Sequence, residues 1–138
     1  MLFRSNPAGA RALLDFWNEH FPGKNIHLVY GSVRDKAVDE IAGLLFPRAA
    51  SVTLTEPRQA RAIFAAELAR IAGHFVSSGR LEIIRDPSGA LEHAISLAAP
   101  DDAVFATGSL YLAGDLRRYW AVRPRAIAES NHALRSAS

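Results

Sequence analysis

The sequence predicts a three-layer, Rossmann-like α/β domain with a mainly parallel sheet. Short apolar runs alternate along the chain with longer segments whose apolar residues recur at helical spacing. Gly, Pro, Asn and Asp, which commonly end regular elements, separate many of these segments. Such alternation is typical of βαβ units, in which helices cover both faces of a parallel sheet.

The first predicted helix covers residues 8–21, between an Asn-Pro start signal and the stop signal Pro22-Gly23. Residues 26–30 follow as a short buried strand. A second helix covers residues 38–45, where apolar residues form one stripe, and Pro47 closes it. The stripes imply that each helix buries one face against the sheet.

The middle of the chain repeats this alternation. Residues 51–54 form a strand rich in β-branched side chains. A third helix, over residues 64–75, follows the loop that contains residues 56–58. Residues 81–84 then form another strand, and residues 91–98 carry the apolar stripe of a fourth helix.

Residues 103–106 are predicted as the last strand, followed by a fifth helix from about Ser109 to Trp120. We therefore assign residues 1–122 to one domain. The Ala- and Arg-rich residues 123–138 are predicted to form a loosely ordered tail. Because the strands can cover every helical stripe, we expect a monomer or a weak dimer.

Composition limits the possible functions. The 138 residues include no cysteine, which excludes a disulfide, a thiolate nucleophile and Cys-ligated zinc. No apolar run approaches the roughly 20 residues that span a bilayer, and the N-terminus lacks a signal-peptide pattern. We therefore expect a cytoplasmic protein with no membrane partner. The net charge of +2 is too small to indicate a nucleic-acid partner.

Three loops that follow predicted strands are rich in cationic or hydroxyl side chains. Ligands of such folds bind at the carboxyl ends of the strands. Arg34, Lys36 and Arg58 supply positive charge there, and Ser109 begins the last helix. Helix N-termini at the same edge favour anions through free amides and the helix dipole. We therefore expect an anion site at this edge. For each single residue the alternative is a helix cap or a solvated surface cation.

Several well-known catalytic motifs are absent from the sequence. It contains no G-x-x-x-x-G-K-[ST] P-loop, no G-x-G-x-x-G, no G-x-S-x-G and no H-E-x-x-H. The five histidines show no metal-ligand spacing, which favours solvated or core-edge positions for them. Asp101-Asp102 is typical of a turn before a strand. We therefore expect neither a metal site nor a catalytic residue in this chain.

Four runs of residues occur in a specific order between about Asn6 and Arg118. They are Asn6-Pro7-Ala8-Gly9-Ala10-Arg11-Ala12, Tyr30-Gly31 with Asp35-Lys36, Thr55 with Pro57-Arg58-Gln59-Ala60, and Asp101-Asp102 leading into Thr107-Gly108-Ser109-Leu110-Tyr111-Leu112. Together they resemble the C-terminal domain of folylpolyglutamate synthase and dihydrofolate synthase, within the Mur ligase superfamily. The first and last runs are the most specific.

The resemblance implies part of an ATP-dependent ligase that adds glutamate to folate or dihydropteroate. Such ligases transfer the ATP γ-phosphoryl group to a substrate carboxylate, and the amine of glutamate then attacks the acyl phosphate. An N-terminal domain of the family carries the P-loop and the Mg²⁺ ligands. This chain is therefore expected to be the closing C-terminal domain, inactive by itself. The family's amino-acid-holding loops match Lys36 and Ser109, and Arg34 and Arg58 add positive charge beside them.

The sequence differs from the family pattern near its N-terminus. The family places Asp-Gly-Ala-His before the Asn-Pro pair, and its Asp and His contact the nucleotide. Here those places hold Leu2-Phe3-Arg4-Ser5. Because the family's Asp and His are not at these places, Asn6 and Arg11 are the candidates for nucleotide contacts in this chain. A solvated helix arginine is the alternative for Arg11.

Three other functions stay open. A free-standing anion-binding α/β domain has the same loops but no partner domain. A peptidoglycan-type Mur ligase domain differs in its substrate and not in its fold. Nucleic-acid binding through residues 117–125, where arginines alternate with aromatic side chains, is the least favoured, because cations at a helix C-terminus stabilise the helix dipole.

Overall fold

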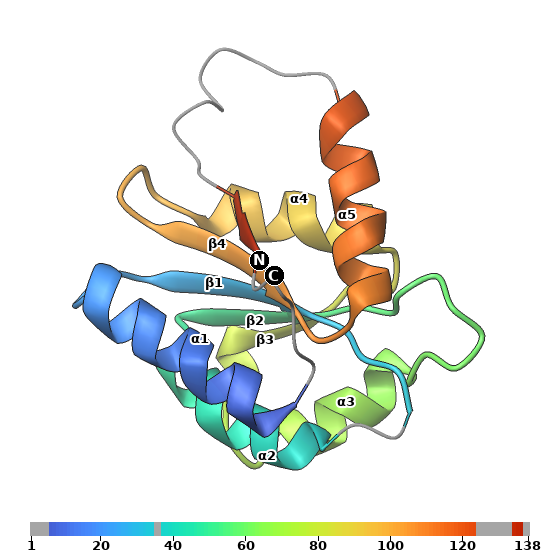
Figure 1. The fold of residues 1–138 in the computed structure, drawn as a ribbon, viewed down its shortest axis with the longest axis horizontal. Helices are drawn as coiled ribbons and strands as arrows, with labels where there is room; N and C mark the ends of the chain where they lie inside the picture. The colour runs from blue at the N-terminus through green and yellow to red at the C-terminus, as the bar shows by residue number, and fades with distance from the viewer. Residues whose placement is uncertain (1–5, 35–36, 124–133, 137–138) are drawn as a thin grey trace.

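The computed structural model describes residues 6–34, 37–123 and 134–136 and contains one parallel β-sheet (Figure 1). The strand order is β3-β2-β1-β4-β5, and every neighbouring pair is parallel. The strands are β1 (Ile26–Tyr30), β2 (Ser51–Leu54), β3 (Leu81–Ile83), β4 (Ala103–Thr107) and β5 (Leu134–Ser136). The parallel sheet agrees with the prediction made from the alternation of elements.

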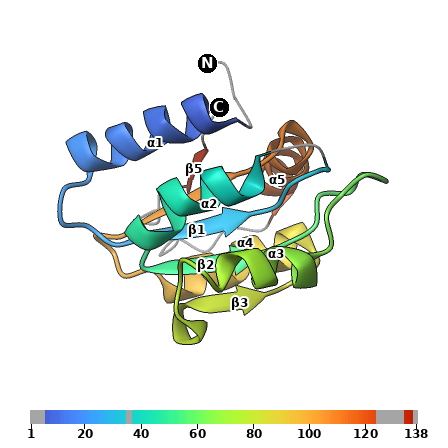
Figure 2. The same cartoon turned by 90° about the horizontal axis from the view of Figure 1, so that it is seen from below.

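Helices cover both faces of this sheet. One face carries α1 (Pro7–His20), α2 (Val38–Leu45) and α3 (Ala65–Ala72), and the other carries α4 (Pro87–Leu97) and α5 (Leu110–Val122). Figure 2 shows the first three helices in front of the sheet and α4 and α5 behind it. Two short 3₁₀ helices, η1 (Phe46–Arg48) and η2 (Ser78–Arg80), complete the described elements. The predicted three-layer fold is confirmed.

Strand β1 lies in the middle of the sheet, and all five of its residues are buried. Successive side chains of a strand point to opposite faces. Leu28 accordingly packs in the core beneath α1, α2 and α3, whereas Val29 packs beneath α4 and α5. A strand covered on both faces requires a nearly continuous apolar run, which is the pattern that predicted it.

His27 is the polar exception in β1, and it lies near the amino-terminal edge of the sheet. Its Nδ1 is 2.8 Å from Ser51 Oγ, and its Nε2 is 2.9 Å from Asp102 Oδ2. Burial acts to raise the pKa of the Asp102 carboxyl, but hydrogen bonds from the Ala99 amide and from His27 outweigh it and lower that pKa. His27 therefore holds the starts of neighbouring strands together, in agreement with its interpretation as a core-edge residue.

Helix α3 is shorter than the predicted helix over residues 64–75. The chain before it is extended because it pairs with the loop after β1, where the Ile63 amide donates to the Ser32 carbonyl at 2.9 Å. Phe64 therefore lies before the first turn and is 59% exposed. Phe75 lies beyond the helix and still packs against the core.

The segment predicted as a loosely ordered tail, residues 123–138, includes two described parts. The Arg123 guanidinium is buried and donates to both carboxylate oxygens of Glu92, at 2.7 and 2.6 Å. Residues 134–136 form β5, which pairs with β4. The other residues of the segment lie outside the described part of the chain. Within the described part, no helix is long and apolar enough to cross a bilayer.

Candidate functional site

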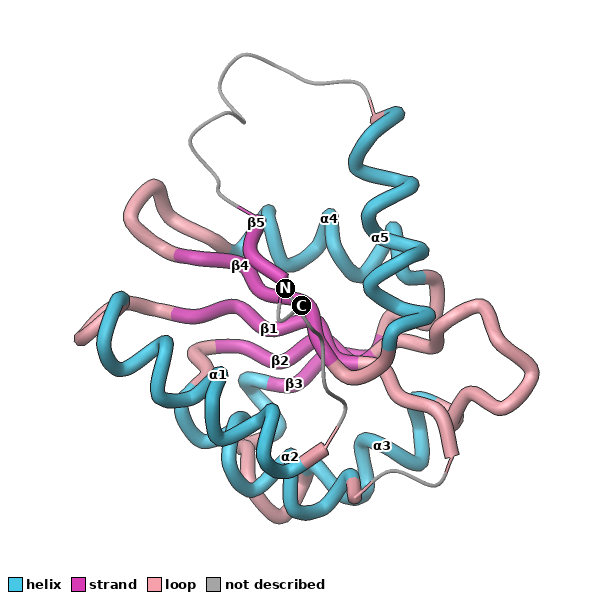
Figure 3. The backbone as a smooth tube through the Cα atoms, in the orientation of Figure 1, coloured by secondary structure: helices cyan, strands magenta, loops and turns pink. Residues whose placement is uncertain are grey.

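The carboxyl ends of β1, β2, β3 and β4 share one edge of the sheet because these strands are parallel (Figure 3). The loops after β1, β2 and β4 therefore open on the same edge, as predicted. The loop after β3 joins them, since the Glu56 amide and Thr55 Oγ1 both donate to the Arg85 carbonyl, at 3.1 and 2.9 Å. The loop after β3 was not predicted as part of the site, although Asp86-Pro87 is a recognisable helix-start signal.

Two glycines allow these loops to approach closely. Gly108 has φ +127°, and a Cβ on it would lie 2.0 Å from the Gly31 carbonyl oxygen. A Cβ on Gly31 would lie 2.8 Å from the Thr55 carbonyl oxygen. Both distances are too short for any side chain. The Gly-Ser pair after β4 is therefore explained first by backbone packing between the loops.

Ser109 is the N-cap of α5 and is almost completely buried. Its Oγ accepts a hydrogen bond from the Leu112 amide at 3.1 Å. The capping role that the sequence left open is therefore present. A hydroxyl that accepts one hydrogen bond still has a hydrogen to donate, so the predicted substrate contact of Ser109 is compatible with its capping role.

Side chains of the chain itself occupy three helix N-termini at this edge. The Glu56 carboxylate accepts from the Ala65 amide at 2.8 Å at the start of α3, and Asp86 accepts from the Gly89 amide at 2.9 Å in α4. Ser109 caps α5 in the same way. The prediction that these N-termini offer free amides is wrong for the capped amides, because acidic and hydroxyl side chains already bind them.

The cations predicted to bind substrate come from two loops, the loop after β1 and the loop after β2. Arg34 is exposed in the loop after β1, and its backbone amide donates to the Arg61 carbonyl at 2.9 Å. Lys36 belongs to the same loop and lies outside the described residues. Arg58 belongs to the loop after β2 and is bonded to residues of α5 and of the start of α4.

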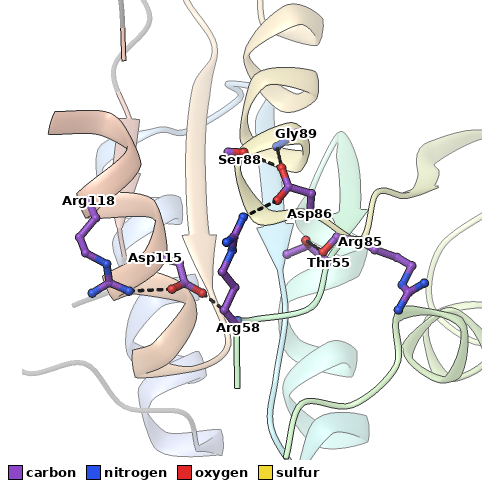
Figure 4. Close-up of polar contacts among 8 residues, drawn as sticks. All are labelled: Thr55, Arg58, Arg85, Asp86, Ser88, Gly89, Asp115 and Arg118. Carbon is purple, nitrogen blue, oxygen red and sulfur yellow. Dashed lines mark hydrogen bonds and ion pairs between the residues drawn. The ribbon is translucent and has the colours of Figure 1, made fainter. Parts of the chain in front are cut away.

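Arg58 is held by carboxylates from two different helices (Figure 4). Its backbone amide donates to Asp115 Oδ2 in α5 at 2.8 Å, and its Nη2 is 3.1 Å from Asp86 Oδ1 at the start of α4. Asp115 Oδ1 also pairs with Arg118 at 2.7 Å. Asp86, Asp115 and Arg118 were not predicted as site residues, because nothing in the local pattern joins them to Arg58.

The two predicted nucleotide-binding residues lie at the start of α1. Asn6 is its N-cap, and Asn6 Oδ1 accepts from the Gly9 amide at 2.8 Å. Arg11 is exposed one turn further along the helix. Because α1 runs opposite to β1, this end of the helix is directed toward the carboxyl edge of the sheet (Figure 1). No group of three His, Asp or Glu side chains within the described ranges is placed to hold a metal ion.

Comparison with known proteins identifies relatives for most of the chain. Residues 3–110 match the family described as "Mur ligase, glutamate ligase domain". A probable bifunctional folylpolyglutamate synthase/dihydropteroate synthase of Haloferax volcanii is 32% identical over 118 residues. That match covers 83% of this chain and 13% of the relative.

Solved structures give the same result for the fold. The folylpolyglutamate synthase of Mycobacterium tuberculosis, complexed with ADP and AMPPCP, has a TM-score of 0.80 and 30% identity. The match covers 89% of this chain and 29% of that protein. A bifunctional folylpolyglutamate synthase/dihydrofolate synthase with Mn, AMPPNP and L-glutamate bound has a TM-score of 0.75 and 23% identity over 87% of this chain and 28% of that protein. The chain therefore spans less than a third of each of these relatives.

Proposed function

This chain belongs to the Mur ligase, glutamate ligase domain family, and we propose that it is the domain of an ATP-dependent acid–amino-acid ligase that helps hold the incoming glutamate. The observation that carries the proposal is the Gly108-Ser109 turn. It joins β4 to α5 and packs against the loop after β1, which contains Arg34 and Lys36. One hydroxyl and a cationic loop are thereby directed to the same edge of the sheet.

The chemistry of glutamate suits this arrangement. Glutamate has two carboxylates, and its amine must be held beside the activated substrate carboxyl to attack it. In this proposal the Ser109 hydroxyl donates to one carboxylate, and Lys36 or Arg34 pairs with the other. Such positioning requires no acid or base from this chain, only a fixed orientation and stabilisation of charge.

ATP with Mg²⁺ supplies the activating phosphoryl group in the complete enzyme. The residues of this chain do not fit a principal ATP and Mg²⁺ site, because the sequence has no P-loop and the described residues have no acidic metal cluster. We assign that role to an N-terminal P-loop domain, and only a peripheral nucleotide contact to Asn6 and Arg11. The partner domain is consistent with the share of each relative that the chain covers.

We propose folate or dihydropteroate as the acceptor substrate. The support is that the relatives from Haloferax volcanii and Mycobacterium tuberculosis, at 32% and 30% identity, are named folylpolyglutamate synthases. These names favour the folate ligases over the peptidoglycan-type alternative. A free-standing anion-binding domain is less favoured, since the matched relatives are all longer than this chain.

The test uses Ser109→Ala and Lys36→Ala in the full-length enzyme. Each change removes a hydrogen bond or ion pair to a charged group, so the KM for glutamate is expected to rise about tenfold or more. The KM for ATP should change little, since the nucleotide is bound elsewhere. Ser109→Thr keeps the hydroxyl and serves as the conservative control.

The melting temperature of Ser109→Ala distinguishes a substrate-binding role of Ser109 from a helix-capping role. Loss of the α5 cap alone costs about 1 kcal/mol of stability and leaves glutamate kinetics unchanged. A lowered melting temperature with an unchanged KM for glutamate in Ser109→Ala would therefore refute the substrate role of Ser109.

A further inference from the structure

A pocket of about 240 Å³ lies between the start of α4 and the middle of α5, beside the loop after β2. Its lining residues are Arg58, Pro87, Ser88, Asp115, Arg118 and Tyr119. Figure 4 shows Arg58 rising between α5 and the start of α4, with Arg118 on the other side of Asp115. Ser109 does not line this pocket, so the pocket differs from the site of the proposed function.

The charges of this pocket are not equally accessible. The side chains of Arg58 and Arg118 are 73% and 75% exposed, whereas that of Asp115 is 9% exposed. Both Asp115 oxygens are already engaged, one by the Arg58 amide and the other by Arg118. A solute that enters the pocket therefore meets two guanidinium groups before it meets the carboxylate.

The negative charge of Asp86, the second carboxylate near Arg58, is stabilised by the N-terminus of α4. Asp86 accepts from the Ser88 hydroxyl and from the Gly89 amide, and these bonds, the first above all, lower the pKa of its carboxyl. The positive end of the α4 dipole also offsets this negative charge. The Arg58–Asp86 pair is exposed on both sides, and such pairs contribute little and open readily.

The donors needed to hold an oxyanion are available. A guanidinium carries five N–H donors in a planar fork, and bidentate binding of carboxylate or phosphate is its preferred use. In the part of the chain that the structure describes, the ion pairs of Arg58 and Arg118 each engage one terminal nitrogen. Ser88 also lines the pocket, but its hydroxyl hydrogen is already donated to Asp86, so the arginines supply the donors.

We propose that this pocket binds a small oxyanion, a carboxylate or a phosphate group, through Arg58 and Arg118. Asp115 is the positioning residue, because its two oxygens fix the Arg58 backbone and the Arg118 side chain on adjoining walls. The site does not depend on the proposed ligase function, because it is a property of the chain by itself.

The test is a titration of the 138-residue chain with inorganic phosphate and, separately, with glutarate, followed by NMR shifts of the backbone amides. Saturable shifts at Ser88 and Tyr119 are expected with at least one anion. Tighter binding of phosphate would identify a phosphate group as the ligand, and tighter binding of glutarate would identify a carboxylate. Arg58→Ala and Arg118→Ala should each weaken binding about tenfold, as expected for the loss of a charge-assisted contact.

Arg70→Ala is the matched control, since it removes the same charge from α3 on the opposite face of the sheet. It should change the dissociation constant by less than about twofold, because exposed charges at that distance are screened. Equal weakening by Arg70→Ala, or the absence of saturable shifts with both anions, would overturn the proposal.

Asp115→Asn tests the positioning role. Asparagine keeps an oxygen that can accept from the Arg58 amide but loses the ion pair with Arg118. Binding should weaken less than in Arg58→Ala, and the hydrogen-exchange rate of the Arg58 amide should stay as in the wild type, because its acceptor is kept. Wild-type affinity after Asp115→Ala, in which both contacts are lost, would show that Asp115 positions neither arginine.

Discussion

At the scale of single residues, the candidate site depends on a backbone approach that only glycine allows. Gly108→Ala places a methyl group against the Gly31 carbonyl and forces alanine into a positive φ. The free energy of unfolding should fall by at least about 2 kcal/mol. Urea denaturation of the chain measures this loss.

Gly79→Ala provides the control for the change of residue type. A Cβ at Gly79 meets nothing within 4 Å, and its φ is not in the positive region. Gly79→Ala should therefore change the free energy of unfolding by less than about 0.5 kcal/mol. Similar losses in both variants would show that the close approach of the two loops is not what requires glycine at residue 108.

At the scale of elements, polar residues at the C-terminal end of α5 bind Glu92 of α4. The Arg123 side chain is 4% exposed, pairs with Glu92 and stacks over Trp120 at 4.7 Å, and Tyr119 Oη donates to Glu92. Glu92→Ala removes the carboxylate that pairs with the buried guanidinium, so it should destabilise the chain by about 2 kcal/mol. Glu19→Ala, which breaks an exposed pair with His20, should change stability by less than about 0.5 kcal/mol.

The same cluster predicts a dependence on pH. Hydrogen bonds from Arg123 lower the pKa of the Glu92 carboxyl in the folded chain, despite the opposing effect of burial. A lowered folded-state pKa stabilises the chain above the unfolded value of about 4.3, and this stabilisation is lost as the pH falls through the folded-state pKa. The stability difference between wild type and Glu92→Ala should therefore shrink on acidification. A difference that is constant from pH 7 to below 4 would contradict this account.

At the scale of the whole molecule, the chain has a complete core but lacks the motif for binding ATP phosphates. Its two apolar clusters lie on opposite faces of one sheet. We therefore expect a single cooperative unfolding transition and a monomer or weak dimer in sedimentation experiments. The same preparation should neither hydrolyse ATP nor ligate glutamate, because the sequence has no P-loop. Folate-dependent ATP turnover by the purified 138-residue chain would disprove this expectation.

Local sequence patterns were enough to predict the fold class and the edge of the sheet at which the loops meet. Hydrophobic periodicity is a local property, so β1 and β2 were predicted with their observed bounds. The direction of parallel strands then placed the loops after β1, β2 and β4 together. Boundaries were less predictable where pairing replaced a helical turn, as it does before α3.

Long-range packing determines how these loops are held and which of their polar groups already have hydrogen-bond partners. Asp115 binds the amide of Arg58 across 57 residues of sequence, and Arg123 binds Glu92 across 31. Such contacts leave no periodic pattern, because they depend on how the helices pack and not on neighbouring residues. For the same reason, the sequence indicated helix N-termini with free amides at this edge, while the folded chain covers three of them with Glu56, Asp86 and Ser109.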